Sequence, residues 1–166
     1  MNITRICRHF WMAQWQIRCN FPVHTLAAIK SAIRDAEASH VGEIRFALEA
    51  ALRPGQLMQG MTARERALEV FSQLKIWDTQ HNNGVLIYVL LGDRAVEIVA
   101  DRGIHLKAGG DVAWRRIIQT MQHAFKEGRF EAGAVSGIAA VADHLAQHFP
   151  VADSDTGELP DDVALL

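Results

Sequence analysis

The chain has 166 residues, of which 49% are hydrophobic and 22% charged, and its formal net charge is -2. This length and balance suit one soluble domain with a real core, and they argue against a nucleic-acid binder that relies on a basic surface. We find no run of the ~20 apolar residues that a membrane-spanning helix needs, and no continuous apolar segment of a secretory signal. We therefore expect a cytoplasmic protein, in which Cys7 and Cys19 are reduced because they lack metal or redox spacing.

Residues 1–20 are predicted to form a basic amphipathic helix. Apolar side chains share one face over residues 2–19, and Trp11 and Trp15 lie one turn apart on a neighbouring stripe. Such a helix can lie on an anionic membrane surface, pack on its own domain, or pack on a sister subunit in a homo-oligomer. The pattern alone does not choose among these three.

The middle of the chain alternates between strand and helix patterns. In chain order we expect a helix over 23–39, a strand over 43–50, a loop at 53–55, a helix over 62–76, and strands over 85–91 and 96–101. Thr62 and Glu65 form the pattern of a capping box. Gly92-Asp93 predicts a two-residue hairpin turn, with positive φ. A strand, a helix and a further strand in succession predict a right-handed βαβ crossover.

The last third is predicted to be helical after one loop. We expect a loop over 104–110, helices over 112–126 and 130–148, and an acidic, disordered tail after Pro150. The predicted domains are thus the helix at 1–20, an α/β domain at 21–150 and the tail at 151–166. The predicted fold class is α/β, with a small mixed sheet, a βαβ crossover plus a β-hairpin, sandwiched by helices.

Polar residues gather where the strand at 85–91 begins and the strand at 96–101 ends. In an antiparallel pair these points lie side by side, and we call this border of the sheet the strand-end edge. The residue types suit a divalent metal, with candidate ligands Asp78, His81, Asn82, Asp101 and His105. Candidates for binding a phosphate or a partner are Glu43, Asn83, Arg94 and Arg102. The alternative is ordinary turn chemistry and solvated charges.

Other catalytic motifs do not occur. The sequence has no GxSxG nucleophile elbow, no GxGxxG fingerprint and no P-loop. Nucleophilic and nucleotide-dependent mechanisms are therefore poorly supported, and neither cysteine lies in a nucleophile motif.

Residues from about 23 to 149 resemble the TPM domain, a family found in bacterial membrane-associated proteins and in a thylakoid lumen protein. The matching segments are Gly42-Glu43-Ile44, Phe71, Asn83-Gly84-Val85-Leu86, Asp93-Arg94, Arg102-Gly103-Ile104, Phe125 and Gly128-Arg129-Phe130-Glu131-Ala132-Gly133. The resemblance implies an α/β sandwich, calcium binding at the strand-end edge, acid phosphatase activity, and accessory roles in membrane protein assembly or repair.

Two positions depart from the family pattern in ways that matter for calcium. Asn82 stands where the family commonly has Asp, and His105 stands where it commonly has Glu. Calcium prefers carboxylate oxygens, so both changes weaken such a site, and an imidazole suits a softer ion such as zinc. The signal peptide and the membrane span that are usual in the family are also missing, which predicts a soluble variant, cytoplasmic or peripheral at a membrane.

Two functions remain as hypotheses. The first is a non-enzymatic TPM-like module that docks a protein partner, a membrane protein being one candidate. The second is a metal-assisted phosphatase, in which the metal activates water and Arg94 or Arg102 holds the phosphate.

Overall fold

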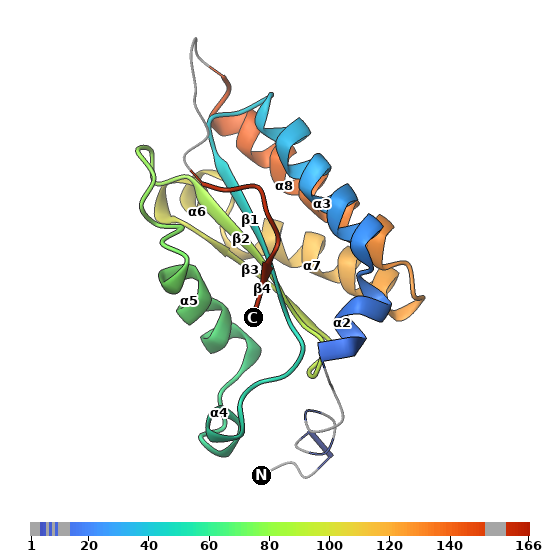
Figure 1. The fold of residues 1–166 in the computed structure, drawn as a ribbon. Coiled ribbons are helices and arrows are strands. Elements are labelled where there is room, and N and C mark those ends of the chain that lie inside the picture. Colours follow the sequence, from blue (N-terminus) through green and yellow to red (C-terminus); the bar gives the residue numbers. More distant parts are fainter. Residues whose placement is uncertain (1–3, 6, 8, 10–13, 152–158) are drawn as a thin grey trace.

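The strands form where apolar, β-branched residues are most concentrated. The computed structural model describes residues 4, 5, 7, 9, 14–151 and 159–166. One mixed sheet has the strand order β3-β2-β1-β4, with bounds β1 (Glu43–Glu49), β2 (Gly84–Leu90), β3 (Ala95–Ala100) and β4 (Ala164–Leu165). β1 runs parallel to β2, and β2 runs antiparallel to β3, so the predicted βαβ crossover and hairpin are confirmed. Figure 1 shows this sheet between two groups of helices.

One face of the sheet carries the larger core. It is covered by α2 (Gln14–Asn20), α3 (Val23–Glu37), α7 (Asp111–Lys126) and α8 (Phe130–His148). Ile44, Phe46 and Leu48 are fully buried against these helices, as their alternation in the sequence predicts. α7 and α8 pack closely, because a Cβ atom at Gly137 would lie 2.3 Å from the sulfur of Met121.

The opposite face is covered by α4 (Pro54–Met58), α5 (Ala63–Gln73) and the C-terminal segment 159–166. The predicted capping box begins α5: the Thr62 hydroxyl accepts the Glu65 N–H at 3.1 Å, and Glu65 accepts the Thr62 N–H at 2.7 Å. Because both faces are covered, every residue of β1 and β2 is buried.

Two predicted loops contain short helices. α4 begins inside the expected loop at 53–55, and α6 (Arg102–Lys107) replaces most of the expected loop at 104–110. Asp101 is the N-cap of α6, and its carboxylate accepts the N–H of Arg102 at 2.6 Å. This cap explains why a helix begins directly at the end of β3.

The expected disorder of the tail is wrong for residues 159–166. β4 pairs with β1 in parallel, and the N–H of Leu166 donates to the carbonyl of Leu48 at 3.0 Å. Leu159, Ala164 and Leu166 pack against the smaller core, which offsets the acidic composition of the segment. The rest of the predicted disordered stretch, at 152–158, lies outside the described residues.

The hairpin turn is longer than predicted. The last pair of the ladder joins Leu90 to Ala95, so four residues connect β2 to β3 instead of two. The positive φ, 53°, occurs at Arg94 and not at Gly92. We call this border of the sheet the hairpin-turn end.

The described part of the N-terminal segment packs on its own domain. Ile17 and Phe21 are 3% and 1% exposed in the larger core, whereas Trp15 is 59% exposed. Trp11 lies outside the described residues. Within the described ranges, no helix combines the length and apolar character that crossing a membrane requires.

Candidate functional site

The strand-end edge brings together residues from three separate parts of the chain. β1 and β2 begin at the same border, where Glu43 is paired with Gly84, and β3 ends there, where Ala100 is paired with Val85. Asn83 and Asp101 therefore flank the same two strand ends. The parallel arrangement of β1 and β2 places Glu43 at this edge, as the sequence predicts.

Asn83 braces the fold from a buried position. Its side-chain amide donates to the carbonyl of Val41 at 2.9 Å, and its backbone N–H donates to the Thr79 hydroxyl at 3.1 Å. The side chain thus ties the entry of β2 to the entry of β1. This use explains why an Asn precedes Gly84 at this point.

The two carboxylate oxygens of Asp101 differ in their hydrogen bonding. Its Oδ1 caps α6, while its Oδ2 is buried and has no hydrogen-bond partner among the described residues. α6 is pressed on the loop before β2, since a Cβ atom at Gly103 would lie 2.4 Å from the Asn82 carbonyl oxygen and 2.8 Å from that of His81. The edge is therefore a tightly packed platform.

The remaining candidates at this edge face outward. Asp78, His81, Asn82 and Arg102 are exposed, and Asn82 adopts a left-handed backbone with φ 51°. His105 is half-buried, and its Nε2 lies 3.9 Å from the Asp111 carboxylate. No hydrogen bond between two of these outward-facing side chains occurs in the described structure.

Glu43 points to the α5 face and holds the C-terminal segment. It is 3% exposed, and its carboxylate accepts the N–H of Leu159 at 3.1 Å. Nearby, burial, the charge of Glu43 and the charge of Asp161 together raise the pKa of Glu37 to about 8. Of these acidic groups, Glu43 is the one that bonds the segment 159–166 to β1.

Arg94 lies at the hairpin-turn end, across the length of β3 from Arg102. The two arginines, grouped in the sequence analysis as alternative phosphate ligands, are therefore not part of one site. Arg94 belongs to a different surface.

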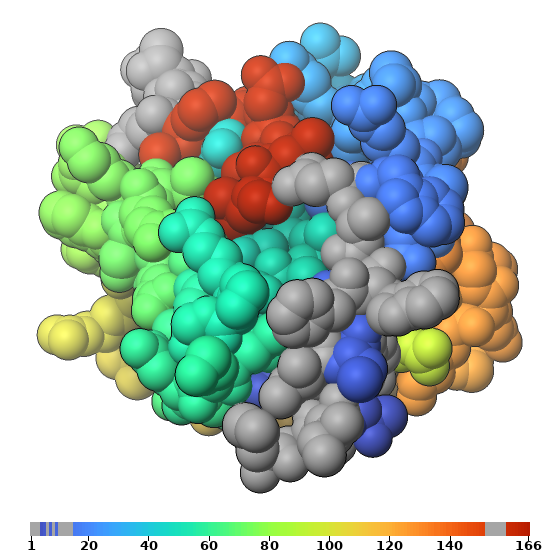
Figure 2. All heavy atoms as spheres, turned by 60° about the horizontal axis from the view of Figure 1, so that its bottom comes forward, coloured from blue at the N-terminus to red at the C-terminus, as the bar shows by residue number. Residues whose placement is uncertain are grey.

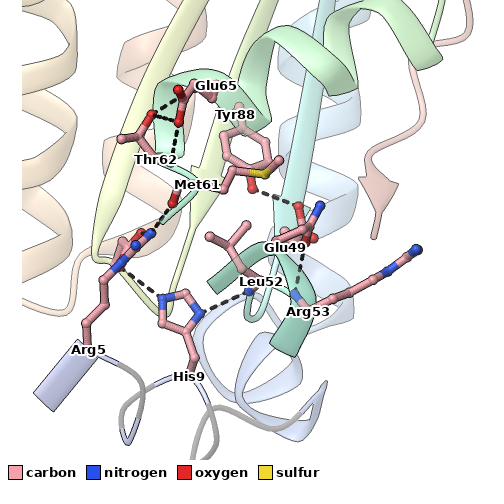
Figure 3. Close-up of polar contacts among 11 residues, drawn as sticks. Arg5, His9, Glu49, Leu52, Arg53, Met61, Thr62, Glu65 and Tyr88 are labelled. Carbon is pink, nitrogen blue, oxygen red and sulfur yellow. Dashed lines mark hydrogen bonds and ion pairs between the residues drawn. The ribbon is translucent and has the colours of Figure 1, made fainter. Parts of the chain in front are cut away.

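The hairpin-turn end carries a second polar cluster, which no sequence motif predicts (Figure 3). Arg5 donates to both carboxylate oxygens of Asp93, at 2.8 and 2.7 Å, and to the carbonyl of Met61 at 2.6 Å. His9, 4% exposed, lies 2.9 Å from Asp93 and accepts the Leu52 N–H at 3.0 Å. Although burial opposes it, hydrogen bonds from Arg5 and His9 hold the pKa of Asp93 below its usual value.

A buried network between β1, β2 and α5 is the third polar cluster. The Glu49 carboxylate accepts from the Arg66 guanidinium at 2.8 Å and from the Tyr88 hydroxyl at 2.7 Å. All three side chains are at least nine-tenths buried. Burial and the adjacent Glu49 charge raise the pKa of Tyr88, which stays a neutral hydrogen-bond donor. These hydrogen bonds link α5 to β1 and β2, so the three residues stabilise the fold.

The family model of the TPM domain matches residues 22–144, which is most of the chain. The chain belongs to the TPM domain family. The resemblance drawn from the sequence is thus confirmed, and the predicted TPM-like sandwich agrees with the sheet and helices described above.

Two solved structures have a similar fold. The NMR structure of the BA42 protein from the psychrophilic bacterium Bizionia argentinensis is 37% identical over 86% of this chain and 92% of that one, with a TM-score of 0.75. The N-terminal domain of a protein from P. gingivalis, also solved by NMR, is 20% identical over 76% and 79%, with a TM-score of 0.59, and supports the fold alone. No curated protein matches the chain.

A divalent metal in this TPM domain would need several ligands to converge. Calcium takes about 6–8 oxygen ligands, and zinc about four in a closed site. Within the described residues, no three His, Cys, Asp or Glu side chains gather closely enough to hold an ion. Asp101 Oδ2 alone does not make such a site. Metal binding stays a prediction.

Proposed function

We propose that this TPM domain is a binding module that docks a protein partner at the strand-end edge. The observation that carries the proposal is a pair of exposed apolar side chains, Trp77 and Leu106, which are 51% and 72% exposed. Trp77 lies in the loop that leads to β2, and Leu106 lies on α6, which packs on that loop at Gly103. Trp and other large side chains on a rigid base are typical of residues that dominate binding energy.

Some polar groups at this edge hydrogen-bond within the fold and others face outward, and this division supports binding over catalysis. Asn83, Glu43 and one oxygen of Asp101 hydrogen-bond within the fold. The side chains that remain outward include His81 and Arg102, and Arg102 makes no ion pair with a described residue. On α6, Leu106 lies one helical turn from Arg102, and an apolar side chain next to an unpaired cation suits a partner segment that combines apolar and acidic residues. A cytoplasmic segment of a membrane protein is one candidate.

Site-specific photo-crosslinking tests the proposal in cells. A photo-reactive residue at position 77 is expected to capture a defined protein that the same residue at position 58 does not. Met58 is the matched control, because it is 77% exposed and lies on α4, away from this edge.

The captured protein is then purified and titrated with variants. Trp77→Ala and Leu106→Ala are each expected to weaken binding about tenfold or more, which corresponds to about 1.4 kcal/mol, and Met58→Ala to leave it unchanged. Equal affinity for wild type and both edge variants would overturn the assignment of this surface.

The metal-assisted phosphatase is the alternative, and Asp101 is the observation in its favour. Asp101 Oδ2 is buried and unpartnered directly beside Arg102. If this function holds, p-nitrophenyl phosphate turnover with calcium, magnesium, manganese or zinc is expected to disappear in Asp101→Asn and fall in Arg102→Gln. Glu127→Gln is the control, because this exposed carboxylate lies at the opposite end of α7 from Asp111. Absence of turnover with every ion, in protein whose melting temperature no ion raises, would reject the alternative.

A further inference from the structure

A cavity of about 430 Å³ opens at the hairpin-turn end, away from the strand-end edge. It lies between α2, the β2–β3 turn and the junction of α7 with α8. Figure 2 shows this end of the molecule, with the yellow-green turn beside the orange end of α7 and start of α8. Cavities of about 300–1,000 Å³ are the size that proteins use for small ligands.

Aromatic and aliphatic side chains form the walls. Phe125 and Phe130 are stacked with ring centroids 5.4 Å apart, and Trp15 lies on α2 across from them with 59% of its surface exposed. Val89, near the end of β2, and Leu91, directly after it, add to the apolar lining. A ligand in this cavity would therefore contact rings and methyl groups over most of its surface.

Two cations line the same cavity, and no counter-charge for either occurs in the part of the chain that the structure describes. Arg94 and Lys126 both contribute to the lining, and neither forms an ion pair with any described residue. The carboxylates next to these cations in the sequence are engaged elsewhere. Asp93 pairs with Arg5 and His9, and Glu127 pairs with Arg129. An unbalanced positive charge beside an apolar wall favours an anion that carries an apolar group.

The backbone at Arg94 adds a separate observation. Its φ of 53° is a left-handed conformation that glycine adopts without strain and that costs about 1 kcal/mol or more in a residue with a side chain. The turn thus has an arginine at a position whose backbone conformation favours glycine. In addition, the Gln16 side-chain oxygen is buried in this lining and has no partner among the described residues.

We propose that this cavity binds an amphipathic anion, a carboxylate or phosphate monoester on an unbranched or aromatic apolar stem. Arg94 and Lys126 hold the anionic head. Trp15, Phe125 and Phe130 enclose the stem. Gln16 is placed to accept a hydrogen bond from a hydroxyl or N–H group of the ligand.

Calorimetric titration of the full chain with four probes tests the chemistry. Decanoate and decyl phosphate, each below its micelle concentration, are expected to bind about tenfold or more tightly than decanol, which lacks the charge, and inorganic phosphate, which lacks the stem. Binding to vesicles that contain phosphatidic acid is compared with binding of free decyl phosphate, and this comparison distinguishes a membrane-held lipid from a free amphiphile as the ligand. Binding of decanol as tight as that of decanoate, or no binding of either anion, would overturn the proposal.

The variants separate binding from folding. Arg94→Gly removes the head contact and relieves the left-handed backbone, so it is expected to weaken decanoate binding about tenfold without lowering the melting temperature. Lys126→Gln is expected to act in the same direction, whereas Arg115→Gln, an exposed arginine on the same helix outside the cavity, leaves binding unchanged. Trp15→Phe is expected to abolish the ligand-induced change in tryptophan fluorescence. Wild-type affinity in Arg94→Gly, or an equal loss in Arg115→Gln, would count against the cavity.

Discussion

His9 joins the N-terminal segment to the hairpin through Asp93, with 2.9 Å between its Nε2 and the carboxylate. Its other ring nitrogen accepts the N–H of Leu52 at 3.0 Å, so this nitrogen carries no proton. The network assigns the proton to Nε2, which donates to Asp93. Gly92 leaves the space for the ring, since a Cβ atom there would lie 2.5 Å from it. Two charged or polar side chains, Arg5 and His9, thus anchor the segment to one turn.

Asp93→Ala is expected to lower the free energy of unfolding by about 1–3 kcal/mol, because it leaves two buried or half-buried donors without an acceptor. The same change should speed tryptic cleavage within residues 1–20. Urea denaturation and timed proteolysis measure the two effects. Glu127→Ala is the control, because it breaks an exposed pair with Arg129 and should change neither. Equal behaviour of the two variants would contradict the anchor.

Arg66→Met is expected to cost about 3–5 kcal/mol, because the Glu49 carboxylate would stay buried without its cation. Replacing Glu49 by Gln in the same chain removes the uncompensated charge and should restore part of the loss. A double-mutant cycle in urea gives the coupling. Arg34→Met, on an exposed helix position, is the control. If the loss of unfolding free energy in the double variant equals the sum of the losses in the two single variants, Arg66 and Glu49 are not coupled.

Gly103→Ala is expected to destabilise the protein by about 1–3 kcal/mol, since the new methyl group would overlap the backbone of the loop at His81 and Asn82. Gly55→Ala meets nothing within 4 Å and should be neutral. Thermal melts compare the two. A melting temperature for Gly103→Ala equal to that of Gly55→Ala would show that α6 does not pack tightly on this loop.

The raised pKa of Glu37 predicts a pH dependence of stability. Between its ordinary value of 4.5 and the folded value of about 8, the native state holds a proton that the unfolded state has lost. The stabilisation is therefore complete below the lower value and is lost as the pH rises to the upper one. Melting temperatures across this range should fall less steeply in Glu37→Gln than in wild type. Asp35→Asn, on the same helix, should keep the wild-type slope, and an unchanged slope in Glu37→Gln would contradict the prediction.

The fold was largely predictable because its local signals agree with its packing. The alternation of Ile44, Phe46 and Leu48, the capping box at Thr62, and the order of strand and helix all describe interactions close in sequence. The other face of β1 was not predictable. Glu43 and Glu49 suggest a solvated side, yet both are buried, because α5 and the segment 159–166 supply donors that only the folded chain brings near.

The candidate site was predictable at the level of the edge but not of each residue. Strand direction alone places Glu43, Asn83 and Asp101 together. Whether a side chain faces outward or braces the fold depends on its neighbours, and Asn83 is an example, because its amide reaches Val41. The anchor at Asp93 had no signal in the sequence, since His9 is one of eight histidines and has no motif around it.

The same anchor has a consequence for folding kinetics. Arg5 and Asp93 are separated by 88 positions, and Leu159 contacts Glu43 across 116. Closing loops of this length costs chain entropy before any contact repays it, so both terminal segments are expected to join a nucleus formed by β1, β2 and the helices between and beside them. Substitutions in either segment should then accelerate unfolding and leave the refolding rate nearly unchanged. The contacts of the two terminal segments thereby set the unfolding rate, and with it the lifetime of the native state.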